Sequence, residues 1–248
     1  MTIKKYKNEL IRQAHDWLIM AVYEAAKIEH VPFTFPETAE IYKNEYVVAN
    51  KYKHSSYGID VIVNLKRAYK ASLDLANLKN YQFDYKDLLY IHRIIGEGIV
   101  YNNGNFRNLQ VTIKNSTYKP PFPTFPDVWK ERINSILTQS WNIDDVLGLY
   151  ADTMKQQYFN DGNKRTALVF ANTLLLSKEL GFINIPDTQT AKLLVTLVEF
   201  YENKISKQKF VSFIKDKYII HSFEPTYHKN GLKVNKPETF KEHLKSKK

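Results

Sequence analysis

The chain has 248 residues, a formal net charge of +10 and a hydrophobic content of 44%, enough for one large domain or a core with an appendage. No apolar run reaches ~18 residues, and the basic N-terminus does not lead into an apolar stretch, so neither a membrane-spanning helix nor a signal peptide is expected. Cysteine is absent, which excludes disulfides and thiolate metal sites and favours a cytoplasmic protein.

Apolar residues recur at helical spacing along most of the chain, which predicts an all-α domain. The first stripe runs from Leu10 through Ala14 and Trp17 to Ala21. Further helices are predicted, in chain order, at residues 61–69, 88–95, 127–139, 143–154, 187–203 and 207–218, with another directly after Gly162.

One short β-hairpin is expected within this helical fold. Leu109, Val111 and Ile113 alternate with other residues after the turn signal Asn103-Gly104. An exposed hairpin edge can bind a strand of a partner protein through main-chain hydrogen bonds, although simple structural pairing is the alternative. Residues 104–113 are therefore a candidate docking segment.

Two other segments are predicted to be irregular. Residues 119–126 contain four prolines, which exclude a regular helix and predict either an ordered loop near a functional site or a plain connector. Beyond His221 the chain turns polar and basic, which predicts an extended or flexible tail. A solvated tail explains much of the positive charge, so nucleic-acid binding is not expected, and no helix-turn-helix signature supports it.

The most informative stretch is residues 157–168, where a polar turn enters an apolar helix. The unpaired N–H groups and the dipole of a helix N-terminus form an anion site, and Lys164 and Arg165 add positive charge. Asp161 could hold the Mg²⁺ that accompanies a nucleotide. A phosphate site and an ordinary capped helix with solvated charges both fit this spacing.

The same stretch resembles the signature of the Fic/Doc family, His-x-Phe-x-(Asp/Glu)-Gly-Asn-Gly-Arg-x-x-Arg. The positions that match are Phe159, Asp161, Gly162, Asn163 and Arg165. Two departures from the signature matter, because Gln157 replaces the catalytic histidine and Leu168 replaces the second arginine, while Lys164 stands at the position of its second glycine. Residues 163–167 resemble the Doc-like variant Asn-Lys-Arg-Thr-Ala.

Other segments resemble the same family in the same order. Residues 91–93 and 104–111 resemble the helix and hairpin flap that precede the motif, and residues 23–38 resemble the region of the inhibitory helix. The resemblance implies a Fic-type helical bundle with a hairpin flap. It divides the chain into an N-terminal helical region at 1–84 with the inhibitory-helix-like segment, a Fic core at 85–203, and a C-terminal helix with a basic tail at 204–248.

The resemblance implies protein AMPylation, in which AMP passes from ATP to a hydroxyl of a target protein. Asp161 would hold Mg²⁺, Gly162, Asn163 and Lys164 would bind phosphate, and Arg165 would bind phosphate and neutralise charge in the transition state. Gln157 occupies the position of the catalytic base, and a carboxamide cannot take up a proton, so the activity is expected to be impaired. The target would dock along flap residues Asn105, Phe106, Arg107, Leu109 and Val111.

Two other functions are compatible with these residues. The first is a Doc-like phosphotransferase, which transfers the γ-phosphate and lacks the second arginine. The second is a non-catalytic nucleotide-binding or interaction module of the kind found in bacterial toxin–antitoxin pairs. Association of the chain with itself is left open.

Glu29 matches the glutamate of the family's inhibitory helix, which pairs with the second motif arginine. Because Leu168 occupies that arginine position, the sequence favours the hypothesis that autoinhibition is weakened or absent. Arg165 or Lys164 could replace the missing partner, but as a weak surface pair.

Overall fold

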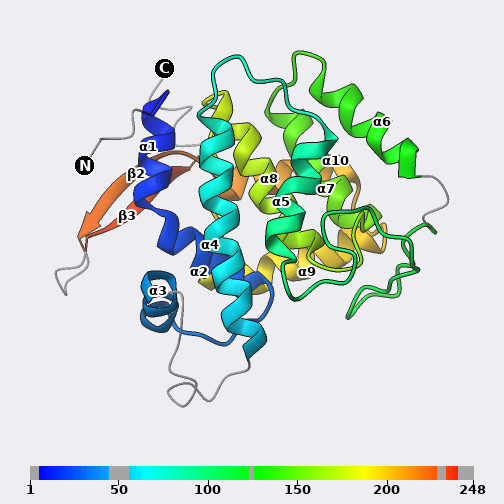
Figure 1. The fold of residues 1–248 in the computed structure, drawn as a ribbon, viewed down its shortest axis with the longest axis horizontal. Helices are drawn as coiled ribbons and strands as arrows, with labels where there is room; N and C mark the ends of the chain where they lie inside the picture. Colours follow the sequence, from blue (N-terminus) through cyan, green and yellow to red (C-terminus); the bar gives the residue numbers. More distant parts are fainter. Residues whose placement is uncertain (1–5, 45–55, 123–125, 228–232, 240–248) are drawn as a thin grey trace.

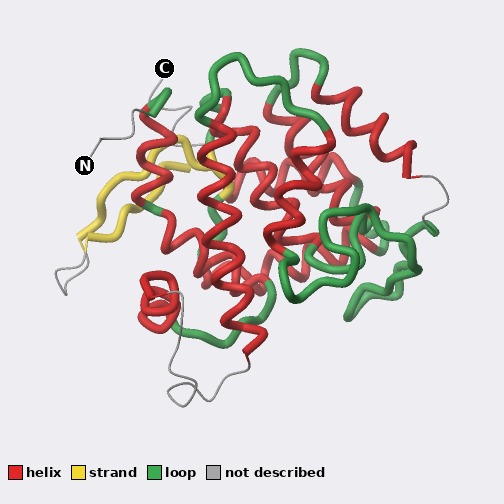
Figure 2. Tube along the Cα trace, in the orientation of Figure 1, coloured by secondary structure: helices red, strands yellow, loops and turns green. Residues whose placement is uncertain are grey.

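The computed structural model describes residues 6–44, 56–122, 126–227 and 233–239, and in this part the chain is mainly helical (Figure 2). The α-helices, in order, are α1 Glu9–Asp16, α2 Leu18–Ile28, α3 Phe35–Asn44, α4 Ser56–Ala76, α5 Tyr85–Ile95, α6 Pro126–Leu137, α7 Ile143–Gln156, α8 Asn163–Ser177, α9 Thr190–Tyr201 and α10 Lys207–Tyr218. A short 3₁₀ turn, Asp187–Gln189, precedes α9. The expected all-α fold is confirmed.

Helix α8 is the centre of the bundle. Thirteen of its 15 residues are buried, so neighbouring elements cover the helix on nearly all sides. Helices α4, α5 and α7 pack against it (Figure 1), and Thr173 of α8 donates a hydrogen bond to Ser72 of α4 at 2.8 Å. The rigid core therefore holds the first turn of α8, at Asn163, in a defined position.

The first predicted stripe is two helices rather than one. Helix α1 ends at Asp16 and α2 begins at Leu18, with Trp17 between them. The Trp17 indole N–H donates a hydrogen bond to the side chain of Asn184 at 3.2 Å. Asn184 is 167 positions away in the chain, and the spacing of apolar residues near Trp17 carries no information about such a contact. The break between α1 and α2 was therefore not predicted.

Helix α3 was not predicted as a separate element. Its start carries a capping box, since Glu37 accepts a hydrogen bond from the Thr34 backbone N–H at 2.7 Å. The sequence Thr-x-x-Glu was the signal that could have identified it. By contrast, α10 begins and ends at the predicted residues, with Ser206 as its N-cap.

The strands lie elsewhere than expected. Strands β1 Phe182–Ile183, β2 Ile219–Tyr227 and β3 Lys233–Thr239 form an antiparallel sheet in the order β1-β2-β3. Residues 104–113 contain no strand, so the prediction of a hairpin there was wrong. They belong to an irregular loop, which Figure 2 shows at the opposite end of the molecule from the sheet.

An extended or flexible tail was expected beyond His221, and the described part of this region forms strands β2 and β3. The basic residues 240–248 lie outside the described part. The described part of the proline-rich segment, residues 119–122, is irregular as predicted, and Pro126 begins α6. Among the described residues, no helix combines the length and the apolar character needed to cross a bilayer.

Candidate functional site

The N-terminus of α8 is open to an anion. Gly162 precedes the helix with φ +76°, a left-handed conformation that glycine adopts without steric cost. Among the described residues no side chain caps this end, so the N–H groups of the first turn are available to a ligand. The Gly162 N–H itself donates to the Asp161 carboxylate at 2.6 Å. The geometry fits the predicted phosphate site.

Asn163 braces the turn with its side chain. Its Oδ1 accepts from the Phe159 N–H at 2.9 Å, while its Nδ2 donates to the Phe159 carbonyl at 2.8 Å and to Gln157 Oε1 at 3.0 Å. Both polar atoms of the Asn163 side chain are therefore hydrogen-bonded within residues 157–163. Asn163 was expected to bind phosphate, and with its side chain engaged only its backbone N–H is available for this.

Arg165 is the principal cation of the site and is only 1% exposed. Its Nη2 lies 3.4 Å from Asp161 Oδ2 and 3.5 Å from the hydroxyl of Tyr57. Its Nε and Nη1 have no hydrogen-bond partner in the part of the chain that the structure describes. A buried guanidinium with spare donors is suited to oxygen atoms of a bound anion.

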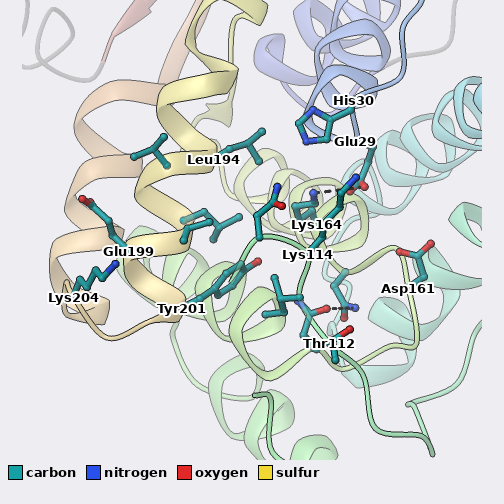
Figure 3. Close-up of a pocket in the computed structure, with 17 residues that line it drawn as sticks. Glu29, His30, Thr112, Lys114, Asp161, Lys164, Leu194, Glu199, Tyr201 and Lys204 are labelled. Atoms are coloured by element: carbon teal, nitrogen blue, oxygen red, sulfur yellow. Dashed lines mark hydrogen bonds and ion pairs between the residues drawn. The ribbon is translucent and has the colours of Figure 1, made fainter. Parts of the chain in front are cut away.

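Glu29 follows α2 and reaches the same place from the N-terminal region. Its Oε1 lies 3.8 Å from Arg165 Nε, and its Oε2 lies 3.6 Å from Lys164 Nζ, as Figure 3 shows for the lysine. The Glu29 side chain is 13% exposed, so this contact is largely buried rather than on the surface as expected. Leu168, at the position of the missing arginine, is buried beside α2 and has no part in this contact.

Gln157 lies at the end of α7 in a left-handed conformation, with φ +50°. Its side-chain amide donates to the Met154 carbonyl and accepts from Asn163, so both ends of the carboxamide are bonded. The residue lines the same cavity as Asp161 and Lys164. It faces the site as expected, but without a proton-accepting nitrogen.

His92 supports the motif from α5. Its ring stacks on Phe159 with centroids 3.7 Å apart, and Nδ1 accepts from the Gly104 N–H at 2.9 Å. The other nitrogen, Nε2, therefore carries the proton and donates to the Asp161 carbonyl at 3.1 Å. Burial lowers the pKa of His92 to about 4, so the ring is neutral near pH 7 and packs as a structural residue.

The five residues expected to dock a target do not share one role. Phe106 is 7% exposed and stacks on Phe159 with centroids 6.0 Å apart, and Arg107 is fully buried. The Arg107 guanidinium donates to the carbonyls of Gln157, Leu109 and Pro121. Phe106 and Arg107 are therefore structural, and the exposed candidates are Asn105, Leu109 and, in part, Val111.

Replacing Phe106 with alanine is expected to lower the free energy of unfolding by ~3–5 kcal/mol, because it leaves a cavity among Phe159, Trp129 and Tyr158. The matched variant Leu109→Ala, at a residue that is 52% exposed, is expected to change stability by less than about 0.5 kcal/mol. Urea denaturation measures both. Equal losses would contradict the division of the segment into buried and exposed residues.

A cavity of about 820 Å³ joins these elements, within the size range of small-molecule sites. One end is polar and includes Gln157 together with Asp161 and Lys164, and the last two are labelled in Figure 3. The other end lies along α9 and is largely apolar, with residues such as Leu194 and Tyr201. Residues 112–115 form a further wall.

Few side chains at the site could act as ligands of a metal ion. Among the described residues, no three His, Cys, Asp or Glu side chains form a cluster that could hold a metal ion. Asp161, with its side chain 56% exposed, is the carboxylate next to the anion site. A single carboxylate fits Mg²⁺ that takes its other ligands from phosphate and water.

Two contributors were missed from the sequence. Tyr57 of α4 reaches Arg165, and Tyr201 of α9 lines the cavity. Both come from helices far from the motif in the chain, and nothing in their local sequence marks them. Only the packing of α4 and α9 around α8 could reveal them.

Comparisons with known proteins agree with this geometry. Residues 82–175 match the family model described as the Fic/DOC family. A Fic-domain-containing signalling protein from Bacteroides thetaiotaomicron has a similar structure, with a TM-score of 0.65, 14% identity and 85% of each chain covered. No curated protein matches the chain.

Two longer structures share the fold. A Fic family protein from Desulfovibrio desulfuricans has a TM-score of 0.61 at 16% identity, and a fragment of Fic-1 from C. elegans has 0.63 at 17%. They cover 82% and 85% of this chain, which spans 62% of each of theirs. Together with the motif and its position at α8, these matches show that the chain carries a Fic-type fold and that its residues 82–175 match the Fic/DOC family model.

Proposed function

We propose that this protein binds ATP with Mg²⁺ and has the architecture of a protein adenylyltransferase whose transfer step is impaired at Gln157. The observation that carries the proposal is the anion site at the N-terminus of α8. Open backbone N–H groups, the buried Arg165 and the Asp161 carboxylate meet there at the polar end of a cavity of nucleotide size.

Each residue has a defined part in the proposed reaction. The N–H groups of the first turn of α8 and Lys164 bind phosphate oxygens, and Arg165 stabilises the charge that develops on them. Asp161 would hold Mg²⁺, which when bound neutralises phosphate charge. A hydroxyl of a target protein, docked beside Leu109 and Val111, would attack the α-phosphorus and release pyrophosphate.

Gln157 limits the transfer because the attacking hydroxyl must lose its proton. The carboxamide can accept a hydrogen bond from this hydroxyl and orient it, but it does not bind the proton. The proposed protein therefore retains nucleotide binding and performs transfer slowly.

Transfer of the γ-phosphate, as in Doc-like proteins, is the second candidate. The observation that favours it is Leu168, which is 3% exposed and leaves the site without a second motif arginine. Adenylyl transfer and γ-phosphate transfer both require a base at position 157. Both therefore predict that a histidine there raises the rate of transfer.

The position of the label separates the two candidates. The protein and its Gln157→His variant are incubated with Mg²⁺, a lysate and ATP labelled at the α- or the γ-phosphate. Transfer of α-label by the variant supports adenylyl transfer, and transfer of γ-label supports the Doc-like reaction. If the variant binds ATP and transfers neither label, the proposed activity is wrong and a binding module remains.

We also propose that Glu29 competes with phosphate for Arg165 and Lys164. The weakened autoinhibition expected from Leu168 assumed that Glu29 had lost its partner, whereas its carboxylate lies within 4 Å of both cations. Glu29 Oε1 also lacks a hydrogen bond among the described residues, so its contact is electrostatic and replaceable by a ligand. The cytosol would supply both ATP and target.

Glu29→Gln is expected to tighten the binding of ATP about tenfold, or ~1.4 kcal/mol, because the phosphates no longer displace a negative charge. Isothermal titration calorimetry measures the change. The control Glu131→Gln removes an exposed carboxylate from α6 and is expected to have no effect. An unchanged affinity in Glu29→Gln would restore the hypothesis that autoinhibition is absent.

A further inference from the structure

The wall of the cavity opposite α9 is a segment without secondary structure. Residues 108–118, here called the cavity loop, contain no helix or strand, and 112–115 line the cavity directly. A loop that lacks ladder hydrogen bonds is held in place by its anchors. The position of this wall therefore depends on the side chains that fix the two ends of the cavity loop.

Arg107 fixes the first end. It is fully buried, and its guanidinium donates to the carbonyls of Leu109 in the cavity loop and of Gln157 in the motif. The backbone N–H of Arg107 also donates to the Tyr158 carbonyl at 2.8 Å. These bonds hold the start of the cavity loop beside the motif. They do not reach its other end, near residue 118.

Glu202, the residue after α9, fixes the second end. One carboxylate oxygen accepts from the Thr117 backbone N–H at 3.1 Å, from the Thr117 hydroxyl at 3.3 Å and from the Ser116 hydroxyl at 3.4 Å. The other oxygen lies 2.7 Å from Lys204 Nζ. The bonds from Lys204 and Thr117 lower the pKa of Glu202 to about 2, so the carboxylate is charged near pH 7 and its hydrogen bonds are charge-assisted.

This anchor lies next to the apolar end of the cavity. Tyr118 stacks on Tyr201 with centroids 6.3 Å apart and an interplanar angle of 10°. Lys155 contacts the Tyr118 ring at 5.4 Å and donates to the Phe200 carbonyl at 2.8 Å. The Tyr201 hydroxyl points toward the middle of the cavity, toward Lys114 and Lys164 (Figure 3). The end of the cavity loop and the end of α9 thus form one packed unit.

The two ends of the cavity differ in what they can bind. If phosphates bind at the N-terminus of α8, as the proposed function requires, the remaining space between the cavity loop and α9 takes the nucleoside. The polar end is built on α8 and does not need the cavity loop, whereas the nucleoside end has residues 112–115 as one of its walls.

We propose that Glu202 is a positioning residue, which holds residues 112–115 at the distance from α9 that the nucleoside of ATP requires. It acts through Ser116 and Thr117 and does not touch the ligand. Without the carboxylate, the ligand itself must order the cavity loop, and the cost of that ordering is subtracted from its affinity.

The test compares two ligands that share phosphates but not the nucleoside. Isothermal titration calorimetry measures Mg²⁺–ATP and Mg²⁺–tripolyphosphate binding to the full chain and to two variants. Glu202→Ala is expected to weaken ATP about tenfold while tripolyphosphate changes less than about twofold. Glu202→Gln is expected to weaken ATP clearly less than Glu202→Ala and to change tripolyphosphate less than about twofold, because the amide oxygen still accepts from Thr117 although the charge is lost.

The outcomes separate this inference from the proposed function. Equal weakening of both ligands in Glu202→Ala, or no weakening of ATP, overturns the positioning role. A loss of ATP affinity in Glu202→Gln as large as in Glu202→Ala also overturns it, since a hydrogen-bond acceptor retained at position 202 would then have no effect on binding. If the unaltered protein binds neither ligand, the proposed nucleotide site fails, and this inference fails with it.

Discussion

Gln157→His is expected to raise the rate of AMP transfer by ~10²–10⁴-fold, the usual contribution of a general base. The structure is suited to this change. Position 157 has φ +50°, and histidine is among the residues enriched in left-handed conformations. The side chain faces the cavity beside Asn163, so an imidazole there would lie at the anion site. Single-turnover labelling with α-labelled ATP measures the rate.

Two controls show whether the histidine at position 157 acts as a base or only alters the shape of the site. Gln157→Asn keeps a carboxamide and suits the same backbone conformation, so it is expected to leave the rate low. The rate of the histidine variant should rise with pH as the imidazole loses its proton, with a midpoint near the ordinary pKa of histidine of ~6.5. A variant that binds ATP as before and gains no rate with any acceptor in a lysate would contradict the proposed role of position 157.

Asp161→Asn, introduced together with Gln157→His, is expected to lower the restored rate by ~10²–10³-fold. A metal ion supplies several kcal/mol of charge stabilisation to phosphoryl chemistry, and each 1.36 kcal/mol is a factor of ten. Asparagine retains an oxygen that can accept the hydrogen bond from Gly162, which is 2.6 Å long with aspartate, so the turn should keep its shape. A lower rate in Asp161→Asn would therefore reflect the loss of the carboxylate charge rather than a change in the shape of the turn.

Binding supplies a second readout of the Asp161 change that does not need activity. In the parent protein, Mg²⁺ is expected to strengthen ATP binding, and in Asp161→Asn this dependence should largely disappear. The matched variant Asp60→Asn removes an exposed carboxylate from α4 and should behave as the parent. If Asp161→Asn retains the full effect of Mg²⁺ on ATP affinity, another group holds the metal and the assignment is wrong.

Local patterns predicted the helices because each helix buries a face that repeats every 3.6 residues. Helix α10 was predicted at both ends, and the polar turn before α8 was predicted as an anion site. The break at Trp17 was missed because a contact with the distant Asn184 accompanies it. The hairpin at 104–113 was wrong because alternation describes which side chains are apolar and does not supply a partner strand.

The sequence by itself determined the Fic-like motif and its departures at Gln157 and Leu168, and it predicted the phosphate-binding turn, since these depend on residues that are contiguous in the chain. Only the tertiary structure decided that Glu29 approaches Arg165, that Phe106 and Arg107 are buried supports, and that Glu202 anchors the cavity loop. Each of these contacts joins segments separated by scores of residues. Such pairs form because helices pack around α8, and that packing depends on the shape of the whole core rather than on any local pattern.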